Sequence, residues 1–226
     1  MKKAVVLGAT GAVGVELVKS LLASNQFERV TTLGRRALDL PNIPPENRVH
    51  EIVDVFTPAS YEKYLAGHDT AFCTMGMGQP SKGTKEEFYR VDVTAPSEFG
   101  KECKRQGIEH FSLLTAVGTN IKSSSLYLRI KGEVEKNIRE LGFKRTSFFR
   151  PSMIMTPTNR YGLLQGMTLA LFPYLDHLLV GPLKAYRSIR VEDLGHAMAL
   201  NAEKPGEGLE ILTWSHFQAL LRNRKI

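Results

Sequence analysis

The sequence predicts an α/β protein built on a doubly wound parallel sheet, with a small cap formed by the C-terminal part of the chain. Short apolar runs alternate with segments of helical spacing, and a glycine-rich turn joins the first run to the first helix. This alternation is typical of parallel sheets, and right-handed crossovers place the helices on both faces. The expected strands are Ala4–Leu7, Val30–Leu33, Val49–Val53, Thr70–Thr74, His110–Thr115 and Thr146–Phe149. The expected helices are Val13–Ser24, Ala59–Tyr64, Glu86–Arg105 and Leu126–Leu141.

The first turn carries three glycines, Gly8, Gly11 and Gly14. A strand-to-helix turn directs free backbone N–H groups and the positive end of a helix dipole at one point, which favours a phosphate. Gly8 would allow the tight turn, Gly11 the approach of a pyrophosphate, and Gly14 close packing of helix on strand. Glycines also occur as simple loop punctuation, but the flanking strand and helix favour a dinucleotide. The expected contacts are Gly8, Thr10, Gly11, Ala12, Val13 and Gly14.

Two arginines, Arg35 and Arg36, follow the second strand, where an acidic residue would otherwise hold a ribose 2′-hydroxyl. A guanidinium matches a 2′-phosphate in charge and fork geometry, whereas a carboxylate repels it. The sequence therefore predicts NADP(H) as the cofactor. The alternative is a solvated basic turn.

Two weaker signals follow the third and fourth strands. Asp54 ends the third strand, where its carboxylate is placed either to accept an adenine amino hydrogen or to cap a helix. Gly76 follows the fourth strand and would let the backbone pass close to the adenosine ribose. Both residues are expected at the cofactor.

Tyr127 and Lys131 stand four residues apart in a helical segment, so their side chains fall on one face. An ammonium beside a phenol favours the phenolate and lowers the pKa of the tyrosine. Tyr127 is thus a candidate general acid for carbonyl reduction, and Lys131 a candidate for binding the nicotinamide ribose as well. The alternative is a partly buried tyrosine; the position after the fifth strand favours catalysis.

The fifth strand ends at Thr115, whose hydroxyl is expected at the rim of the same cleft, where it would bind the substrate oxygen. The competing hydroxyls are Ser123, Ser124 and Ser125, which equally suit a helix cap. We expect Thr115 to complete the catalytic set with Tyr127.

The chain has 226 residues, which suits one domain. Residues 1–150 are expected to form the dinucleotide-binding core, and residues 151–226 a substrate-side cap and C-terminal elements. Within the latter we expect helices at Gly162–Leu171 and Glu192–Ala202 and a strand at Ser188–Val191. The two cysteines have no paired spacing, so we expect no disulfide and a reducing cytoplasm.

The formal net charge is +7, which suits nucleic acid, an anionic membrane or an anionic cofactor. The cations are scattered and no nucleic-acid-binding motif is present, so nucleic acid is not an expected partner. The apolar segment Tyr161–Val180 is interrupted by Pro173 and Asp176, so no membrane span is expected. The six histidines lack ligand spacing, which predicts no metal site.

The motifs GATGAVG, LGRR, YLRIK and FRPS together resemble the atypical branch of the short-chain dehydrogenase/reductase superfamily. More closely, the order LGRR, GHDTAFCTMG, EEFYRVD, HFSLLTAVG, SSSLYLRIKGEVE and FFRPSMI is similar to the Tat-interacting-protein oxidoreductase family and its bacterial relatives. The similarity extends from the first strand to about Ile154.

The resemblance implies a Rossmann fold with NADPH along the strand ends, the glycine turn under the pyrophosphate, and Arg35 and Arg36 at the 2′-phosphate. It also implies Tyr127 and Lys131 as the catalytic pair. Pro151 and the backbone after it would hold the nicotinamide carboxamide.

The chain departs from the family pattern in two places. Thr115-Ala116 stands where relatives tend to carry serines, and Pro151-Ser152 where they often have Pro-Gly. Threonine keeps the hydroxyl but restricts its rotamer. Two functions are therefore open: an NADPH-dependent reductase of an unidentified small molecule, and a non-catalytic NADPH sensor that regulates a partner. A monomer or small homo-oligomer is expected in either case.

Overall fold

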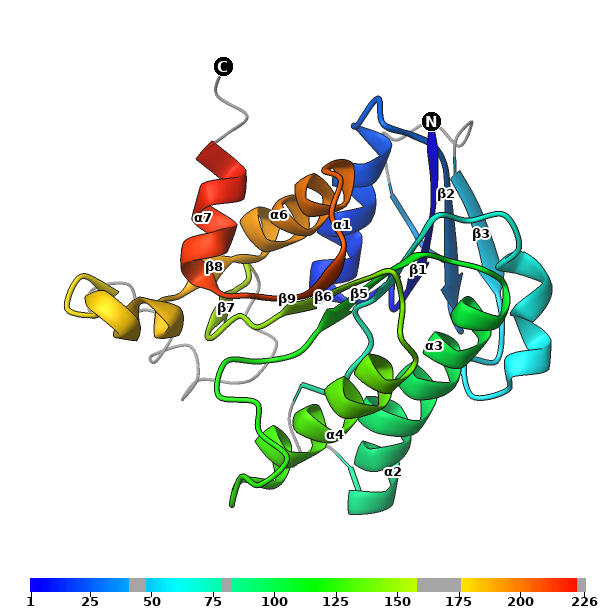
Figure 1. Cartoon of the computed structure of the whole chain (residues 1–226). Helices are drawn as coiled ribbons and strands as arrows, with labels where there is room; N and C mark the ends of the chain where they lie inside the picture. Colours follow the sequence, from blue (N-terminus) through cyan, green and yellow to red (C-terminus); the bar gives the residue numbers. More distant parts are fainter. Residues whose placement is uncertain (41–47, 79–82, 158–175, 223–226) are drawn as a thin grey trace.

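The computed structural model of the chain describes residues 1–40, 48–78, 83–157 and 176–222. Within them lies a seven-stranded sheet in the order β3-β2-β1-β4-β5-β6-β9, with each strand parallel to its neighbours (Figure 1). The predicted doubly wound parallel sheet is therefore confirmed. The strands are β1 (Lys2–Leu7), β2 (Phe27–Gly34), β3 (Arg48–Ile52), β4 (Thr70–Cys73), β5 (His110–Leu114), β6 (Arg145–Phe149) and β9 (Gly208–Leu212).

The helices lie on both faces of the sheet (Figure 1). On one face, α1, α6 and α7 pack a core that includes Leu17, Leu194 and Phe217; on the other, α3 and α4 bury Phe99 and Val134. These buried residues recur at helical spacing and exclude water from the sheet faces. The helices are α1 (Ala12–Leu22), α2 (Lys85–Tyr89), α3 (Ala95–Arg105), α4 (Leu126–Glu140), α6 (Val191–Glu203) and α7 (Trp214–Arg222).

The chain order reverses between β1 and β4, which are neighbours in the sheet although β2 and β3 lie between them in sequence. The register pairs Ala4 with Thr70 and Leu7 with Cys73, so both strands end at the same edge. The connections leave in opposite directions there and open a crevice, which is where such sheets bind ligands.

The segment after residue 150 contributes more than the expected cap. β9 pairs with β6 from Arg145–Gly208 to Phe149–Leu212, and α6 packs against α1. A second, two-stranded sheet joins β7 (Ile154–Met155) to β8 (Ile189–Arg190). The helix expected at Gly162–Leu171 lies outside the described residues.

Two of the expected helices differ in the structure. Residues 59–64 form two short 3₁₀ turns, η1 (Pro58–Ser60) and η2 (Glu62–Tyr64). The helix expected at Glu86–Arg105 is divided by a π-helical segment, η4 (Arg90–Thr94). Pro96 has no N–H and so cannot donate to the Asp92 carbonyl, four residues earlier. The N–H of the preceding residue, Ala95, donates to the Arg90 carbonyl, five residues earlier, which is the π-helical pattern.

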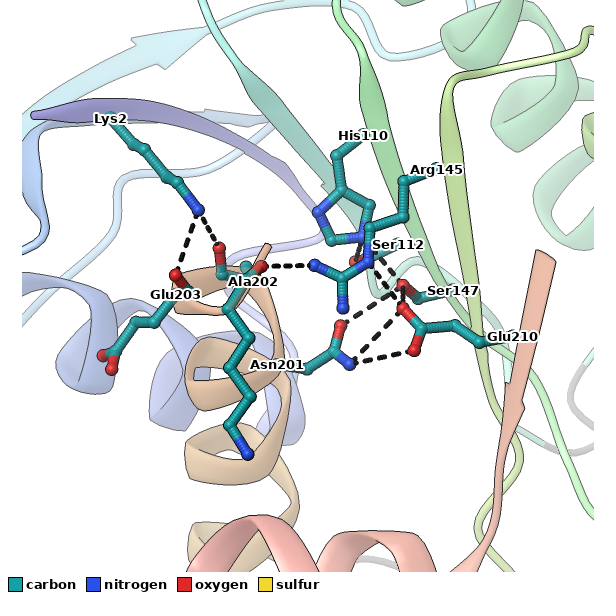
Figure 2. A network of polar contacts seen from close by, with 10 residues as sticks. Lys2, His110, Ser112, Arg145, Ser147, Asn201, Ala202, Glu203 and Glu210 are labelled. Atoms are coloured by element: carbon teal, nitrogen blue, oxygen red, sulfur yellow. Dashed lines mark hydrogen bonds and ion pairs between the residues drawn. The ribbon is translucent and has the colours of Figure 1, made fainter. Parts of the chain in front are cut away.

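A buried polar network closes the amino edge of the sheet, where β5, β6 and β9 begin (Figure 2). Arg145 donates from Nε to Glu210 Oε1 at 2.7 Å and from Nη1 to the Lys204 carbonyl at 2.7 Å. The Ser147 hydroxyl donates to the same Glu210 oxygen at 2.6 Å and lies 2.7 Å from His110 Nε2. The network connects β9 and the end of α6 to the neighbouring strand β6.

Burial, together with the positive charges of Arg145 and Lys2, lowers the pKa of His110 from 6.5 to about 3. The imidazole is therefore neutral at physiological pH. Lys2 donates from Nζ to the carbonyls of Ala202 and Glu203 (Figure 2). Arg145 and Lys2 thus both donate hydrogen bonds to groups of the protein itself.

Candidate functional site

A cavity of about 510 Å³ lies at the carboxyl edge of the sheet, between the turn after β1, the loop after β2 and the loop after β4. The predicted residues that line it are Gly8, Thr10, Gly11, Arg35, Arg36 and Gly76. The other predicted cofactor residues, Ala12, Val13, Gly14, Asp54, Lys131 and Pro151, are not part of this lining. The cavity extends from the glycine turn to Arg35 and Arg36, and this combination of groups suits a dinucleotide.

The glycine turn has no room for a side chain at Gly8 or Gly14. Gly8 has a φ of +89°, and a Cβ on it would lie 2.6 Å from the Met75 nitrogen. A Cβ on Gly14 would lie 2.2 Å from the Gly8 carbonyl oxygen. Gly11 is the N-cap of α1 and has no side chain to bond the first N–H groups of the helix. These donors have no acceptor within the helix, as a phosphate site requires.

The residues that open α1 point away from the cavity. Val13 is buried in the core that α1 shares with α6, and Gly14 packs against the Gly8 carbonyl. Ala12 also packs against that core. These three residues can therefore reach a ligand only through their backbone N–H groups.

The arginines lining the cavity are Arg35, Arg36 and Arg90, the last of which begins the π-helical segment. Among the described residues, no carboxylate lies within 4.0 Å of any of their guanidinium groups. All three arginines are exposed, and guanidinium groups gathered around a cavity favour an anionic ligand. Phe56 lies beside them, with Arg90 Cζ 4.0 Å and Arg35 Cζ 5.4 Å from its ring centroid.

Asp54 uses its carboxylate within its own loop. It accepts hydrogen bonds from the Thr57 hydroxyl at 2.7 Å and the Phe56 N–H at 3.0 Å. The hydrogen bonds from Thr57 and Phe56, with smaller contributions from Arg90 and Arg35, lower the pKa of Asp54. These bonds agree with the alternative in which Asp54 caps its own loop. A contact between Asp54 and the adenine stays a prediction.

Lys131 forms a buried ion pair with Asp92. The Lys131 Nζ lies 2.8 Å from Asp92 Oδ1, and the side chains are 7% and 0% exposed. Asp92 Oδ2 accepts the Met77 N–H at 2.9 Å. A Cβ on Gly76 would lie 3.0 Å from Asp92 Oδ1 and 3.2 Å from Lys131 Nζ, so the glycine makes room for the pair. Burial opposes the charge of Lys131, but Asp92 and then Tyr127 outweigh burial and raise its pKa.

Tyr127 and Lys131 do share one face of α4. The Lys131 Nζ lies 5.9 Å from the centroid of the Tyr127 ring, and the ring stacks on Phe88 with centroids 6.3 Å apart. Tyr127 is partly buried. The Lys131 ammonium therefore lies over the Tyr127 ring while it forms its ion pair with Asp92.

The Thr115 hydroxyl has a different neighbour from the one expected. It donates to Glu135 Oε1 at 2.7 Å; Thr115 and Glu135 are buried, and the partly buried Arg150 joins them. Arg150 donates to both oxygens of Glu135, through Nε to Oε1 at 2.8 Å and through Nη2 to Oε2. The Thr115 hydroxyl is therefore engaged with Glu135 and, at 3.4 Å, with the Phe149 carbonyl.

The remaining predicted residues lie nearby with local partners. The Pro151 carbonyl accepts the Val117 N–H at 2.8 Å, which ties the loop after β6 to the loop after β5. Ser123 accepts from Arg129 through its carbonyl at 2.8 Å, and Ser125 is the N-cap of α4 without a side-chain cap bond. The serines therefore shape the entry to α4.

The residues that sequence reasoning missed are Arg90, Asp92, Phe56 and Glu135. Asp92 stands in the sequence Val91-Asp92-Val93, where apolar neighbours on both sides are a signal of a buried acid. Its partner, however, is 39 residues away on α4, and no local pattern specifies that pairing.

A family model described as NAD(P)H-binding matches residues 8–167. The rat protein HTATIP2 is 38% identical over 154 residues, which is 68% of this chain and 63% of that protein, less than two thirds of its length. The protein FMP52-1, mitochondrial, of Scheffersomyces stipitis is 33% identical over 176 residues, or 76% of each chain.

Solved structures with a similar fold include an oxidoreductase, ylbE, from Lactococcus lactis. Its TM-score is 0.69 at 15% identity, with 97% of each chain covered. MoeE5 in complex with UDP-glucuronic acid and NAD has a TM-score of 0.71 at 18% identity, covering 93% of this chain and 75% of that one. At these identities the similarity is one of fold.

The expected cytoplasmic location is contradicted by the relatives. FMP52-1 of Scheffersomyces stipitis and FMP52 of Debaryomyces hansenii are both named mitochondrial. Unpaired cysteines indicate a reducing environment but do not identify which reducing compartment it is. Among the described residues, no helix combines the length and the apolar character needed to cross a membrane.

Proposed function

This chain belongs to the NAD(P)H-binding family, and from that premise we propose that it is an NADPH-dependent oxidoreductase that reduces a carbonyl group of a small molecule. The observation that carries the cofactor part is the cavity lined by Gly8 and Gly11 of the glycine turn and by arginines that pair with no described carboxylate. The turn suits a pyrophosphate, and the arginines suit a further phosphate that NADP has and NAD lacks.

The residues of the chain divide the proposed work between them. Gly8, Gly11 and the first N–H groups of α1 would bind the pyrophosphate, and Arg35 and Arg36 the 2′-phosphate. The chemistry that a bound nicotinamide supplies is hydride transfer. Tyr127 would hold the proton that the carbonyl oxygen takes up.

In this proposal Lys131 would bind the nicotinamide ribose and would also support Tyr127. Its ammonium lies 5.9 Å from the centroid of the Tyr127 ring, where its positive charge would assist proton transfer from Tyr127. Asp92 keeps Lys131 charged and fixes its position, since the pair is buried and the distance is 2.8 Å. An ammonium held in one place loses no free energy on reorganisation during proton transfer.

Turnover with NADPH tests the proposal. Wild-type protein is expected to consume NADPH with at least one member of a panel of aldehydes, ketones and quinones, and Tyr127→Phe to lose about a hundredfold or more of that rate. Tyr89→Phe is the matched control, because Tyr89 is an exposed tyrosine bonded to Glu133, outside the proposed reaction. Undiminished turnover in Tyr127→Phe contradicts the role of Tyr127.

A second candidate function is a non-catalytic NADPH sensor, and a specific observation favours it. The Thr115 hydroxyl gives its proton to Glu135, so the hydroxyl expected beside Tyr127 is engaged elsewhere. A sensor is expected to bind NADPH, to consume none with any panel member, and to change its hydrogen-exchange pattern on binding. Binding with turnover favours the enzyme instead.

A further inference from the structure

An aromatic ring at the cavity wall holds two cations. Phe56, in the loop that follows β3, is partly buried and lines the cavity. Arg90 Cζ lies 4.0 Å from its ring centroid, and Arg35 Cζ lies 5.4 Å from it. These two arginines come from separate elements, one after β2 and one from η4.

The ring holds the guanidinium groups without neutralising them. The face of a phenyl ring attracts a cation but carries no net charge. Asp54 is the acid whose pKa Arg90 and Arg35 help to lower, yet its oxygens accept bonds from Thr57 and Phe56, and it forms no ion pair within 4.0 Å of either arginine. Two positive charges on one ring repel each other, and a shared anion relieves that repulsion.

The π-helical segment sets the position of Arg90. The bond from the Ala95 N–H to the Arg90 carbonyl widens one turn, and the same turn carries Asp92 to its ion pair with Lys131. Such turns inside helices are frequent at functional sites. Arg90 and Asp92 thus reach the cavity wall and the α4 helix from one irregular turn.

We propose that Arg90, held against Phe56, is a specificity-determining residue that binds the 2′-phosphate of an adenosine together with Arg35. This inference rests on the proposed function and names a residue for its cofactor preference. The ligand class is a 2′-phosphorylated adenosine, because only that half of the cofactor carries a dianion separate from the pyrophosphate that the glycine turn would bind.

Titration calorimetry with two halves of the cofactor tests this inference on the full chain. The probe 2′,5′-ADP carries the 2′-phosphate, and 5′-AMP lacks it. Arg90→Ala is expected to weaken binding of 2′,5′-ADP by about tenfold to a hundredfold and that of 5′-AMP by less than about threefold. Arg90→Lys keeps the charge but loses the fork and is expected to fall between wild type and Arg90→Ala.

Phe56→Leu tests the ring. Leucine keeps an apolar side chain but offers no aromatic face, so the preference for 2′,5′-ADP should fall, whereas Phe56→Tyr should retain it. Arg139→Ala removes an exposed arginine from the far end of α4 and is the matched control, with both affinities unchanged. Unfolding curves of all variants show whether each one is folded.

The outcomes separate this inference from the proposed function. A wild-type preference for 2′,5′-ADP that survives in Arg90→Ala contradicts the role of Arg90 and leaves the proposed cofactor in place. An equal loss for both probes assigns Arg90 to the adenosine and also contradicts the inference. A wild-type protein without any preference for 2′,5′-ADP contradicts both the inference and the NADPH part of the proposed function.

Discussion

The two edges of the sheet treat their cations in opposite ways. At the amino edge, Arg145 bonds Glu210 and a carbonyl, and Lys2 bonds two carbonyls (Figure 2). At the carboxyl edge, Arg35, Arg36 and Arg90 line a cavity, and no described carboxylate lies within 4.0 Å of their guanidinium groups. Both sets are basic, so charge alone does not distinguish a structural cation from one that binds a ligand.

The difference is in what surrounds each cation. A cation satisfied by the protein contributes to the free energy of unfolding, and its loss leaves other groups unpaired. A cation without such a partner contributes little to folding and remains free to bind an anion. Lys131 is at the carboxyl edge but is paired with Asp92, so it combines the two roles.

The largest effect is expected from breaking that pair. Asp92→Asn leaves the buried Lys131 ammonium without a counter-charge and should lower the free energy of unfolding by about 3–5 kcal/mol. Urea unfolding measures this loss. The exposed pair Lys101–Glu98 supplies the control, because Glu98→Gln should cost less than about 1 kcal/mol.

The double variant Asp92→Asn/Lys131→Met sharpens the interpretation. Removing both charges leaves no unpaired ion and should recover much of the stability lost in Asp92→Asn. If Asp92→Asn is as stable as the wild type, the proposal that the buried Lys131 ammonium depends on Asp92 for its counter-charge is contradicted.

The amino edge is next in size. Arg145→Met removes the bonds to Glu210 and the Lys204 carbonyl and should lower the free energy of unfolding by about 2 kcal/mol, since Glu210 is partly exposed. Its affinity for NADP⁺ should equal that of the wild type. If Arg145→Met loses affinity for NADP⁺ but keeps the stability of the wild type, the proposal that Arg145 is a structural cation is contradicted.

The pH dependence of stability tests His110. Its pKa in the folded protein is about 3, below the ordinary 6.5, because it is buried beside Arg145 and Lys2. Below pH 6.5 the unfolded chain binds a proton that the folded chain excludes, so stability is lost as pH falls from 6.5 toward 3. The loss attributable to this residue is about 1.4 kcal/mol per pH unit in that window.

The matched variant for this measurement is His110→Gln, which keeps a polar side chain but cannot titrate. Urea unfolding of both proteins at several pH values gives the two slopes. The slope of the variant should be shallower in the same window. Parallel slopes contradict a neutral, buried His110.

The smallest change in stability is expected at the carboxyl edge. Arg35→Ala should change the free energy of unfolding by less than about 0.5 kcal/mol, because no described carboxylate pairs with Arg35. Thermal unfolding in the absence of nucleotide measures this. A loss comparable to that of Arg145→Met shows that Arg35 is structural as well.

Local patterns in the sequence were sufficient for six strands of the sheet and for the glycine turn. Gly8 and Gly14 are adjacent to the strand and helix that they join, and the structure leaves no room for a Cβ at either position. β9 was missed because its residues Leu209 and Ile211 are exposed on this edge strand, and its five residues carry no buried run. Its place depends on pairing with β6, which is remote in sequence.

The partners of the site residues were beyond the sequence for the same reason. Thr115 directly follows β5 and Lys131 lies within α4, both near their expected places, but their contacts with Glu135 and Asp92 connect separate elements. Arg90 was hidden because a helical pattern around it predicts a regular helix, whereas the missing N–H of Pro96 produces the π-helical turn. Long-range pairing and one backbone irregularity therefore decide the details of this site.

The most direct test of the account is the ratio of the affinities of the wild-type protein for NADP⁺ and NAD⁺, measured by calorimetry under one buffer and salt condition. If the arginines that line the cavity at the carboxyl edge bind the 2′-phosphate, NADP⁺ should bind at least about tenfold more tightly than NAD⁺. Equal affinities, or tighter binding of NAD⁺, contradict the account.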